Sequence, residues 1–311
     1  MNDRIEYSAV IVTYNRLELL KECLKHCLMQ SIPFKEILVV DNNSSDGTGE
    51  YLDSLSSPGV IINVYHSKEN LGGAGGFNKA LELVSKAVDY ILMIDDDAII
   101  DYDYLKNIEP YISDEIQAYS GTVYETDRRI PAQRHKLKSK TFLFCDPVDI
   151  SMYTGPSFSY DLTSFCGLLI SSELIQDIGL PIKEYFIQYD DIEYSLRIRQ
   201  RTKIININSA FIIHKVQIGG QSERVCWKNY YADRNSWDMA LRYSKHPVIY
   251  SLCRFPFHSL RILSHLFMAI SPKDRKYHLD VAALNIEVLK YPFNRRLGFN
   301  PKYTALTVIG Q

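Results

Sequence analysis

Three consecutive aspartates, Asp95, Asp96 and Asp97, follow an apolar run at residues 90–94 that has the character of a buried strand. In open α/β sheets, ligands bind outside the carboxyl ends of the strands. Acidic side chains at such an end are therefore placed to hold a divalent cation that bridges a phosphate. Acidic clusters after strands are also typical of solvated turns and of helix N-caps. The triplet alone leaves both interpretations open.

A second acidic group and a histidine lie in the second half of the chain. Asp190 and Asp191 come where a helix is predicted to begin, near residue 190, and negative charge there complements the helix macrodipole. His214 ends a predicted apolar strand at residues 210–213, where a buried structural histidine is the ordinary interpretation. From the residues alone, helix capping and burial account for all three.

Polar side chains also follow the first two predicted strands. Thr13, Asn15 and Arg16 come after the first strand, where polar groups can bind a nucleotide base and an arginine can stack or pair with phosphate. The alternative for Arg16 is a solvated position at a helix N-terminus. Asp41 ends the second strand, where a carboxylate can accept a hydrogen bond from a base or cap a turn.

A run of glycines, Gly72, Gly73, Gly75 and Gly76, opens a predicted helix. Missing side chains let the backbone approach a ligand, and the free N–H groups of a helix start can bind a phosphate or sugar oxygen. The run matches neither the dinucleotide-binding fingerprint nor the P-loop, because no GxGxxG with a following ribose acid and no GK[ST] is present. The glycines alone are therefore weak support for a binding site.

These candidate residues need a scaffold that brings strand ends together, and apolar periodicity in the first half of the chain predicts one. Strands and helices alternate in the order βαβαβαβ, which favours a parallel sheet with right-handed crossovers and helices on both faces. The predicted strands are 7–12, 36–40, 60–65 and 90–94, and the predicted helices are 16–29, 50–55 and 70–88.

The composition of the 311 residues is that of an ordinary globular protein. Thirty-five basic residues balance 37 acidic ones, so charge gives no case for binding nucleic acid, and we predict no such partner. Six cysteines lack CxxC spacing, and most lie in apolar sequence. They predict buried free thiols, which suits a reducing compartment. The N-terminus lacks the apolar core of a signal peptide, so we expect a cytoplasmic location.

Four segments together resemble the successive strand-end motifs of family 2 inverting glycosyltransferases with the GT-A fold. They are AVIVTYNR at 9–16, VVDNNSSDGT at 39–48, NLGGAGGFNKA at 70–80 and the aspartates at 95–97. The form LGGAGGF is most similar to that of bacterial galactofuranosyltransferases, with rhamnosyltransferases of cell-surface polysaccharide assembly as near relatives. The resemblance covers residues 7–240 and is weak beyond them.

The resemblance implies a fold and a domain organisation. The expected fold is α/β, with a GT-A type mostly parallel sheet, helices on both faces and a C-terminal helical region. The glycosyltransferase domain is expected at residues 1–240, with a nucleotide-sugar half at 1–125 and an acceptor half at 126–240. Residues 241–311 are expected to form a C-terminal amphipathic helical region.

The resemblance also implies roles for single residues. Asp95, Asp97 and His214 are expected to hold Mn²⁺ or Mg²⁺. Asp191 is expected to act as general base, with Asp190 as its partner or as a ligand of the acceptor hydroxyl. Relatives commonly have Trp where this chain has Tyr189, which leaves the acceptor platform open. The groups expected at the donor are Thr13, Asn15, Arg16, Asp41, Gly72, Gly73, Gly75 and Asp96.

The implied reaction is a metal-dependent, inverting transfer of galactofuranose from UDP-galactofuranose onto a hydroxyl of a lipid-linked cell-surface glycan of the O-antigen, capsule or galactan type. dTDP-rhamnose is the main alternative donor. Two other classes stay open. A sugar nucleotidyltransferase needs a glycine-rich basic loop for a triphosphate near the N-terminus, which we do not find. A noncatalytic nucleotide-sugar binding protein would not need the acidic pair at 190 and 191.

Two segments beyond the acidic pair keep alternative interpretations. Arg234 is expected either to approach the diphosphate or to hold its helix against the sheet. From residue 241 onward the chain is amphipathic, aromatic and basic, without a charge-free apolar stretch of about 18 residues that would span a membrane. Residues 241–290 are expected to lie in the membrane interface as a peripheral contact, or to pack on the core or on a second subunit of a homo-oligomer.

Overall fold

The computed structural model describes residues 4–125, 131–215, 224–304, 307 and 309. The chain forms two compact units, and each is described by itself. The first comprises Met1–Lys136, Asp146–Lys183 and Asp191–Gln217, and the second comprises Leu137–Cys145, Glu184–Asp190 and Ile218–Gln311. Residues 126–130, at which the acceptor half is expected to begin, lie outside the described residues, as do 310 and 311 of the C-terminal region.

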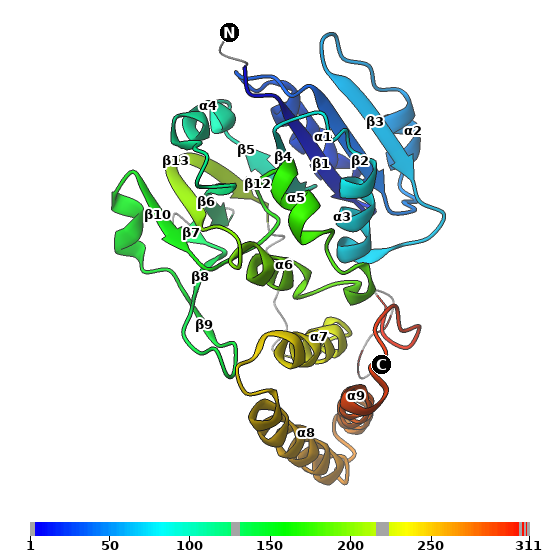
Figure 1. The fold of residues 1–311 in the computed structure, drawn as a ribbon. Helices are drawn as coiled ribbons and strands as arrows, with labels where there is room; N and C mark the ends of the chain where they lie inside the picture. The colour runs from blue at the N-terminus through cyan, green and yellow to red at the C-terminus, as the bar shows by residue number, and fades with distance from the viewer. Residues whose placement is uncertain (1–3, 126–130, 216–223, 305–306, 308, 310–311) are drawn as a thin grey trace. The chain divides into compact units, whose positions relative to one another are not determined.

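The first unit is built on one large mixed sheet (Figure 1). Its strands are ordered β10-β13-β6-β12-β4-β1-β2-β3, and β5 and β7 pair at the side with β13 and β6. The β4-β1-β2-β3 part is parallel, as the alternation of strands and helices predicts, whereas β12 is antiparallel to both of its neighbours. The strands are β1 (Tyr7–Thr13), β2 (Glu36–Asp41), β3 (Ile61–His66), β4 (Tyr90–Asp95), β5 (Ala98–Ile100), β6 (Ala118–Glu125), β7 (Pro131–Ala132), β10 (Ser157–Tyr160), β12 (Leu168–Ser171) and β13 (Ile204–His214).

Helices cover both faces of this sheet because successive side chains of each strand point to opposite sides. From β1, Ala9 and Ile11 pack on one face with α1, while Val10 and Val12 pack on the other with α3. β11 (Leu162–Thr163), β8 (Arg134–Leu137) and β9 (Cys145–Pro147) form a separate small sheet. The helices are α1 (Leu17–Leu28), α2 (Thr48–Asp53), α3 (Gly72–Leu83), α4 (Tyr104–Ile108), α5 (Ser172–Ile178) and α6 (Asp190–Ile198), with 3₁₀ turns at Glu109–Tyr111, Ile150–Thr154 and Lys183–Tyr185.

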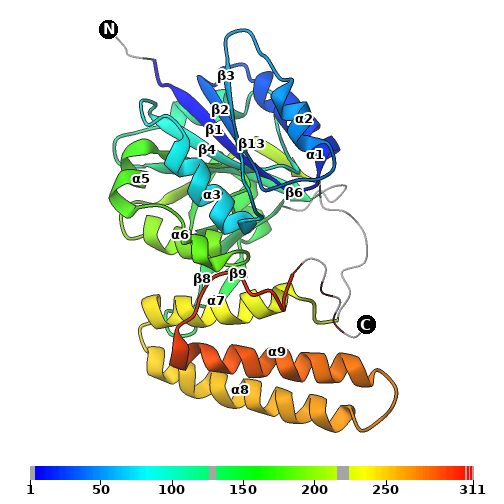
Figure 2. The ribbon, with the colours of Figure 1, turned by 90° about the vertical axis from the view of Figure 1, so that its right-hand side faces the viewer.

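Three helices dominate the second unit: α7 (Lys228–Tyr243), α8 (Pro247–Met268) and α9 (Arg275–Asn294). α8 and α9 pack side by side in antiparallel directions, joined by a short loop (Figure 2). Their core includes Trp237, Tyr250 and Leu284. None of the helices in the described part of the chain has the length and apolar character needed to cross a membrane.

All six cysteines are free, as predicted. The expectation that most of them are buried is wrong for half. Cys23, Cys27 and Cys166 are buried in the first unit, whereas Cys145, Cys226 and Cys253 are exposed. Burial of Cys253 is predicted because it lies in an apolar segment. The cysteine is exposed because it lies on a face of α8 that no described residue covers.

Candidate active site

The local fold brings His214 to the aspartates at 95–97. β4 ends at Asp95, the chain turns, and the three-residue strand β5 then pairs antiparallel with the end of β13, so that Ala98 lies opposite His214. The backbone N–H of Lys215 also donates a hydrogen bond of 2.8 Å to the Asp97 carbonyl. Two segments more than a hundred residues apart are thereby fixed in register at the carboxyl end of β4.

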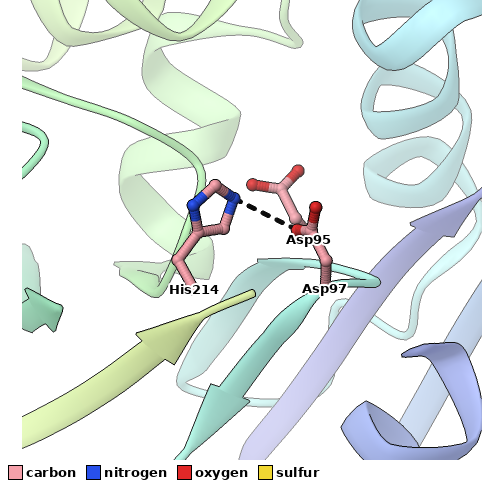
Figure 3. A group of neighbouring side chains, drawn as sticks. All are labelled: Asp95, Asp97 and His214. Atoms are coloured by element: carbon pink, nitrogen blue, oxygen red, sulfur yellow. Dashed lines mark ion pairs between the residues drawn. The ribbon is translucent and has the colours of Figure 1, made fainter. Parts of the chain in front are cut away.

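Asp95, Asp97 and His214 converge there on one point (Figure 3). One ligand atom from each of the three lies within 4.8 Å of the others, and Oδ1 of Asp97 lies 3.2 Å from Nε2 of His214. Figure 3 shows both carboxyl groups turned toward the imidazole. Two carboxylate oxygens and one imidazole nitrogen form a donor set suited to Mn²⁺, and the carboxylates also suit Mg²⁺.

The electrostatics of this cluster show a surplus of negative charge. Burial and the charge on Asp97 together raise the pKa of Asp95 to about 7, while His214 opposes the rise. The pKa of Asp97 is lowered although burial acts in the opposite direction, because His214 and Arg16 stabilise its charge. The pKa of His214 is correspondingly raised by Asp97 and Asp95 against the effect of burial. A cation placed among the three would relieve the repulsion between the two carboxylates.

Two details of this structure fit a metal at these residues. Oδ1 of Asp97 is buried and, among the described residues, has no partner with hydrogen-bond geometry, its approach to His214 being an ion-pair contact only. Nδ1 of His214 lies 3.1 Å from the amide of Gln133, whose other end contacts the Ser164 hydroxyl at 2.6 Å. With the amide turned over, Gln133 accepts the Nδ1 proton and Ser164 accepts from the amide, because a hydroxyl both donates and accepts. The Nε2 lone pair of neutral His214 then faces the carboxylates.

Asp96 points to the end of β1, away from the point at which Asp95 and His214 meet. It accepts hydrogen bonds from the Thr13 hydroxyl at 2.8 Å and from Arg16 at 3.1 Å. Arg16 also contacts Asp97 at 2.6 Å. Burial raises the pKa of Asp96 to about 6, and Arg16 opposes the rise. The structure thus gathers the strand-end residues 13, 16, 96 and 97 into one network at the same edge of the sheet.

A second polar group lies at the end of β2, next to β1. Asp41 pairs in register with Thr13, accepts the Ser44 N–H at 2.9 Å and contacts Nδ1 of His66 at 3.1 Å. Asn15 adopts a left-handed backbone with φ of 52°, and its Oδ1 accepts the Ser45 N–H at 2.7 Å. Asn15 therefore holds the loops after β1 and β2 together, while Asp41 ties its own loop to His66 at the end of β3. These contacts shape the edge of the sheet where a nucleoside is expected.

The glycine run at 72–76 allows close packing of α3, in addition to the expected approach of the backbone to a ligand. A Cβ atom on Gly76 would lie 2.4 Å from Val12, and one on Gly75 would lie 2.8 Å from Leu71. Gly76 therefore lets α3 begin close against β1, and Gly75 leaves room for Leu71 at the start of its own helix. Gly72 has φ of 72°, and its carbonyl accepts a hydrogen bond of 3.0 Å from Asn42. Gly73, in the first turn of α3, is half-buried.

Asp191 lies in the first turn of α6, in the first unit. Burial raises its pKa to about 6, against hydrogen bonds such as the one of 2.7 Å from the Ile192 N–H. Its charge is also among the causes that raise the pKa of Asp95. A carboxylate with this pKa is half protonated in mildly acidic solution and is available as a base near neutrality.

The segment before α6, which belongs to the second unit, has an unusual backbone. Phe186, Gln188 and Tyr189 all have positive φ, between 65° and 70°, and buried Asp190 follows them. The buried side-chain amide of Asn235 donates to the carbonyls of residues 185, 187 and 188 at 2.8–3.0 Å. Strained non-glycine residues persist only where the surroundings fix them. The hydrogen bonds from Asn235 therefore stabilise the strained backbone of this segment.

Arg234, the neighbour of Asn235 on α7, also uses its side chain to hydrogen-bond backbone carbonyls. It is 1% exposed and donates hydrogen bonds to the carbonyls of Glu184, Tyr185 and Gly298. These hydrogen bonds hold α7 to other segments of the second unit, whereas the sheet named in the structural interpretation belongs to the first unit. The partners of Arg234 are the segment at 184–185 and the loop after α9.

The model of the family described as Glycosyl transferase family 2 matches residues 8–167 of this chain. The chain belongs to this family. The match covers just over half of the sequence and includes all the strand-end residues from Thr13 to Asp97. The recognition made from the four motifs is confirmed.

Two curated relatives match this family member over longer stretches. The dTDP-rhamnosyl transferase RfbF of Shigella flexneri is 25% identical over 78% of this chain and 82% of its own length. The galactofuranosyltransferase GlfT1 of Mycolicibacterium smegmatis is 24% identical over 61% of this chain and 64% of its own length. Three further relatives are 30–36% identical, but the chain spans only 36–46% of their length.

Among solved structures, the fold is similar to the mannosyltransferase PcManGT of Pyrobaculum calidifontis, solved in complex with GDP-Man and Mn²⁺. The TM-score is 0.59 at 15% identity, and the match covers 94% of this chain and 89% of that one. The expected GT-A type fold, with helices on both faces of a large sheet and a C-terminal helical region, is confirmed.

Proposed function

We propose that this protein transfers a sugar from a nucleotide-sugar donor to a hydroxyl group of a glycan acceptor, with inversion at the anomeric carbon. The observation that carries the proposal is the convergence of Asp95, Asp97 and His214 at the carboxyl end of β4. Membership of Glycosyl transferase family 2 supports it, as does the likeness to a mannosyltransferase that binds GDP-Man and Mn²⁺.

In the proposed mechanism, the donor lies at the carboxyl ends of β1, β2 and β4. Asp41 accepts a hydrogen bond from the nucleoside, while Arg16 and the start of α3 supply positive charge and N–H groups toward the diphosphate. Asp95, Asp97 and His214 would hold Mn²⁺ or Mg²⁺, which when bound would supply positive charge to the diphosphate leaving group. Gln133 and Ser164 keep the His214 imidazole oriented toward the carboxylates.

Asp191 is the proposed general base, and Asp190 its proposed partner or a ligand of the acceptor hydroxyl. The Asp191 carboxylate takes the proton of the acceptor hydroxyl as the hydroxyl oxygen bonds to the anomeric carbon and the bond to the diphosphate breaks. One displacement of this kind inverts the carbon. The pKa of about 6 keeps Asp191 ionised at neutral pH, yet basic enough to accept a proton.

We propose UDP-galactofuranose as the donor, because the glycine-rich segment resembles that of galactofuranosyltransferases and GlfT1 is a relative. dTDP-rhamnose is the second candidate, favoured by the longer match to RfbF. The proposed acceptor is a lipid-linked cell-surface glycan, and the proposed place of action is the inner face of the cytoplasmic membrane.

The test is a donor panel with the full chain, Mn²⁺ and a synthetic lipid-linked acceptor, read by mass spectrometry. We expect the acceptor to gain a hexose from UDP-galactofuranose. Gain of a deoxyhexose from dTDP-rhamnose alone would replace the first donor by the second. Pyrophosphate release from UTP and a sugar phosphate would contradict the proposal, as would UDP binding without transfer to any acceptor.

A further inference from the structure

The outer face of α8 exposes large apolar side chains along its whole length. Leu252 is 68% exposed and Phe267 is 75% exposed. At the 3.6-residue period of a helix these positions fall on one side of α8, where Pro256 lies in the gap between Leu252 and Leu260. We call this set the α8 apolar face, and it consists of Val248, Ile249, Leu252, Leu260, Leu263 and Phe267.

The α8 apolar face contains no charged side chain. The two arginines of the helix, Arg254 and Arg261, both pair with Asp233 of α7, at 2.9 and 3.8 Å. On the packed side of the helix, Tyr250 and His258 are buried. Exposed apolar patches of this kind mark sites of contact with an apolar partner.

Basic residues stand at both ends of this face. Lys245 lies two residues before α8, Lys273 lies in the loop after it, and Arg275 and Lys276 begin α9; all four are exposed. Residues 245–304 contain ten Lys or Arg against three Asp or Glu, although the whole chain has a net charge of −2. Residues 245–304 therefore carry a clear positive net charge, and the rest of the chain is negative.

We propose that the α8 apolar face docks onto the surface of an anionic lipid bilayer, with the helix lying in the plane of the interface. An apolar face enters the boundary between headgroups and acyl chains, while lysine and arginine reach the phosphates of the headgroups. α8 lies on the bilayer and does not cross it, since no described helix is apolar enough to span.

Charge decides between a bilayer and a second copy of the chain as the occupant. A two-fold symmetric contact through the α8 apolar face would bring Lys245 of one copy to Lys273, Arg275 and Lys276 of the other if the helices run antiparallel. A parallel contact would bring like ends together. Both arrangements oppose positive charges, whereas anionic lipids complement every one of them.

The docking surface deepens the proposed function by naming where the enzyme meets a lipid-linked acceptor, yet its observations all lie in α8 and its flanking residues. The two ideas can therefore fail separately. Transfer to a water-soluble acceptor tests the chemistry, and binding to vesicles without any acceptor tests the surface.

The experiment is flotation of the full chain with vesicles of phosphatidylcholine alone, or of phosphatidylcholine and phosphatidylglycerol in equal parts. We expect binding to the mixed vesicles that weakens as salt is added. Leu260→Glu and Leu263→Glu should each weaken it about tenfold or more, because a charge replaces an apolar group that enters the lipid in the proposed docking. Arg275→Gln with Lys276→Gln should weaken it about thirtyfold, at about 1 kcal/mol for each basic residue.

The matched control is Ile61→Glu, which places the same charge at a residue that is 58% exposed on β3. It should bind vesicles like the wild type. Equal flotation of wild type and Leu260→Glu would overturn the proposal. So would a wild-type dimer, measured by light scattering, that Leu260→Glu dissociates while neither protein binds vesicles. In the supporting outcome, all four variants keep transfer to a water-soluble acceptor, which separates docking from catalysis.

Discussion

Two regions of this molecule depart from the usual distribution of side chains in opposite directions. At the carboxyl edge of the large sheet, carboxylates are buried: Asp96 is 4% exposed and Asp97 is 7% exposed. On α8, large apolar side chains are exposed, Phe267 by 75%. Charged groups are rarely buried unless they are paired or bind metal, and large apolar faces are rarely uncovered unless they meet a partner.

Neither the buried carboxylates nor the exposed apolar side chains are explained by the stability of the fold alone. Buried, mutually repelling carboxylates destabilise a fold, and an uncovered apolar face contributes nothing to it. In the proposals made above, a divalent cation stabilises the first arrangement and a lipid surface covers the second. Substitutions should therefore have opposite signatures. At the sheet edge they remove activity, and on α8 they leave activity in solution intact.

The largest effect is expected from Asp97→Asn. The substitution removes a carboxylate from the metal-binding group, so kcat/KM with Mn²⁺ should fall by about 10⁴-fold, because metal stabilisation of the leaving group supplies several kcal/mol. Asp114→Asn makes the same change at an exposed aspartate and should leave steady-state kinetics unchanged. Comparable activity of the two variants would contradict a role for the Asp97 carboxylate in catalysis.

The next effect belongs to the proposed base. Asp191→Asn should lower kcat about 10³-fold, because no group takes the proton of the acceptor, while calorimetry shows unchanged UDP binding. In the wild type, kcat/KM should fall about tenfold per pH unit below pH 6, since only ionised Asp191 accepts a proton. An acidic limb that persists in Asp191→Asn would assign the titration to another group.

A smaller effect is expected where a buried amide braces backbone in the second unit. Asn235→Ala removes three hydrogen bonds to the segment that precedes Asp190 and should lower the free energy of unfolding by about 3 kcal/mol. Release of the strained segment should also lower kcat for a soluble acceptor more than it raises KM for the donor. Asn294→Ala, at an exposed position of α9, is the control for chemical denaturation.

The raised pKa of the Asp95 carboxylate should make the stability of the metal-free protein depend on pH. Its folded-state pKa of about 7 lies above the value of an unfolded aspartate, so the folded state binds more protons between pH 4 and 7. Stability without metal should therefore decline as pH rises through that range. Thermal unfolding of Asp95→Asn should show a smaller decline, and an identical pH profile would argue against a raised pKa.

The smallest effect in solution is expected on α8. Leu263→Glu changes a side chain that is 62% exposed, so the free energy of unfolding should change by less than about 0.5 kcal/mol. Transfer to a soluble acceptor should also be unchanged. A large loss of stability would show that another part of the chain covers this face, and would contradict its exposure.

The strands and helices of the nucleotide half could be predicted closely because their apolar runs are continuous and bounded by turn residues. β1, β2 and β4 each extend one residue beyond the predicted end, to Thr13, Asp41 and Asp95, since a polar residue can still pair at the end of a strand. α3 ends at Leu83, before the predicted end near 88, because Val84 turns to an extended backbone.

The supporting residues could not be predicted from sequence. β5 is three residues long, too short for periodicity to reveal, yet its pairing with β13 places His214. Gln133 lies 81 residues from the histidine that it contacts, and His66 lies 25 residues from Asp41. Nothing near them in sequence marks either contact, because each depends on which strands become neighbours. The packing role of Gly76 is likewise set by Val12, on another strand.

The central claim, that Asp95, Asp97 and His214 hold a divalent cation, is tested most directly by titrating Mn²⁺ into the full chain with UDP present and following free Mn²⁺ by electron paramagnetic resonance. The account predicts one saturable site in the wild type that is lost in both Asp97→Asn and His214→Ala and kept in Asp114→Asn. Mn²⁺ binding of wild-type strength in the first two variants would contradict it.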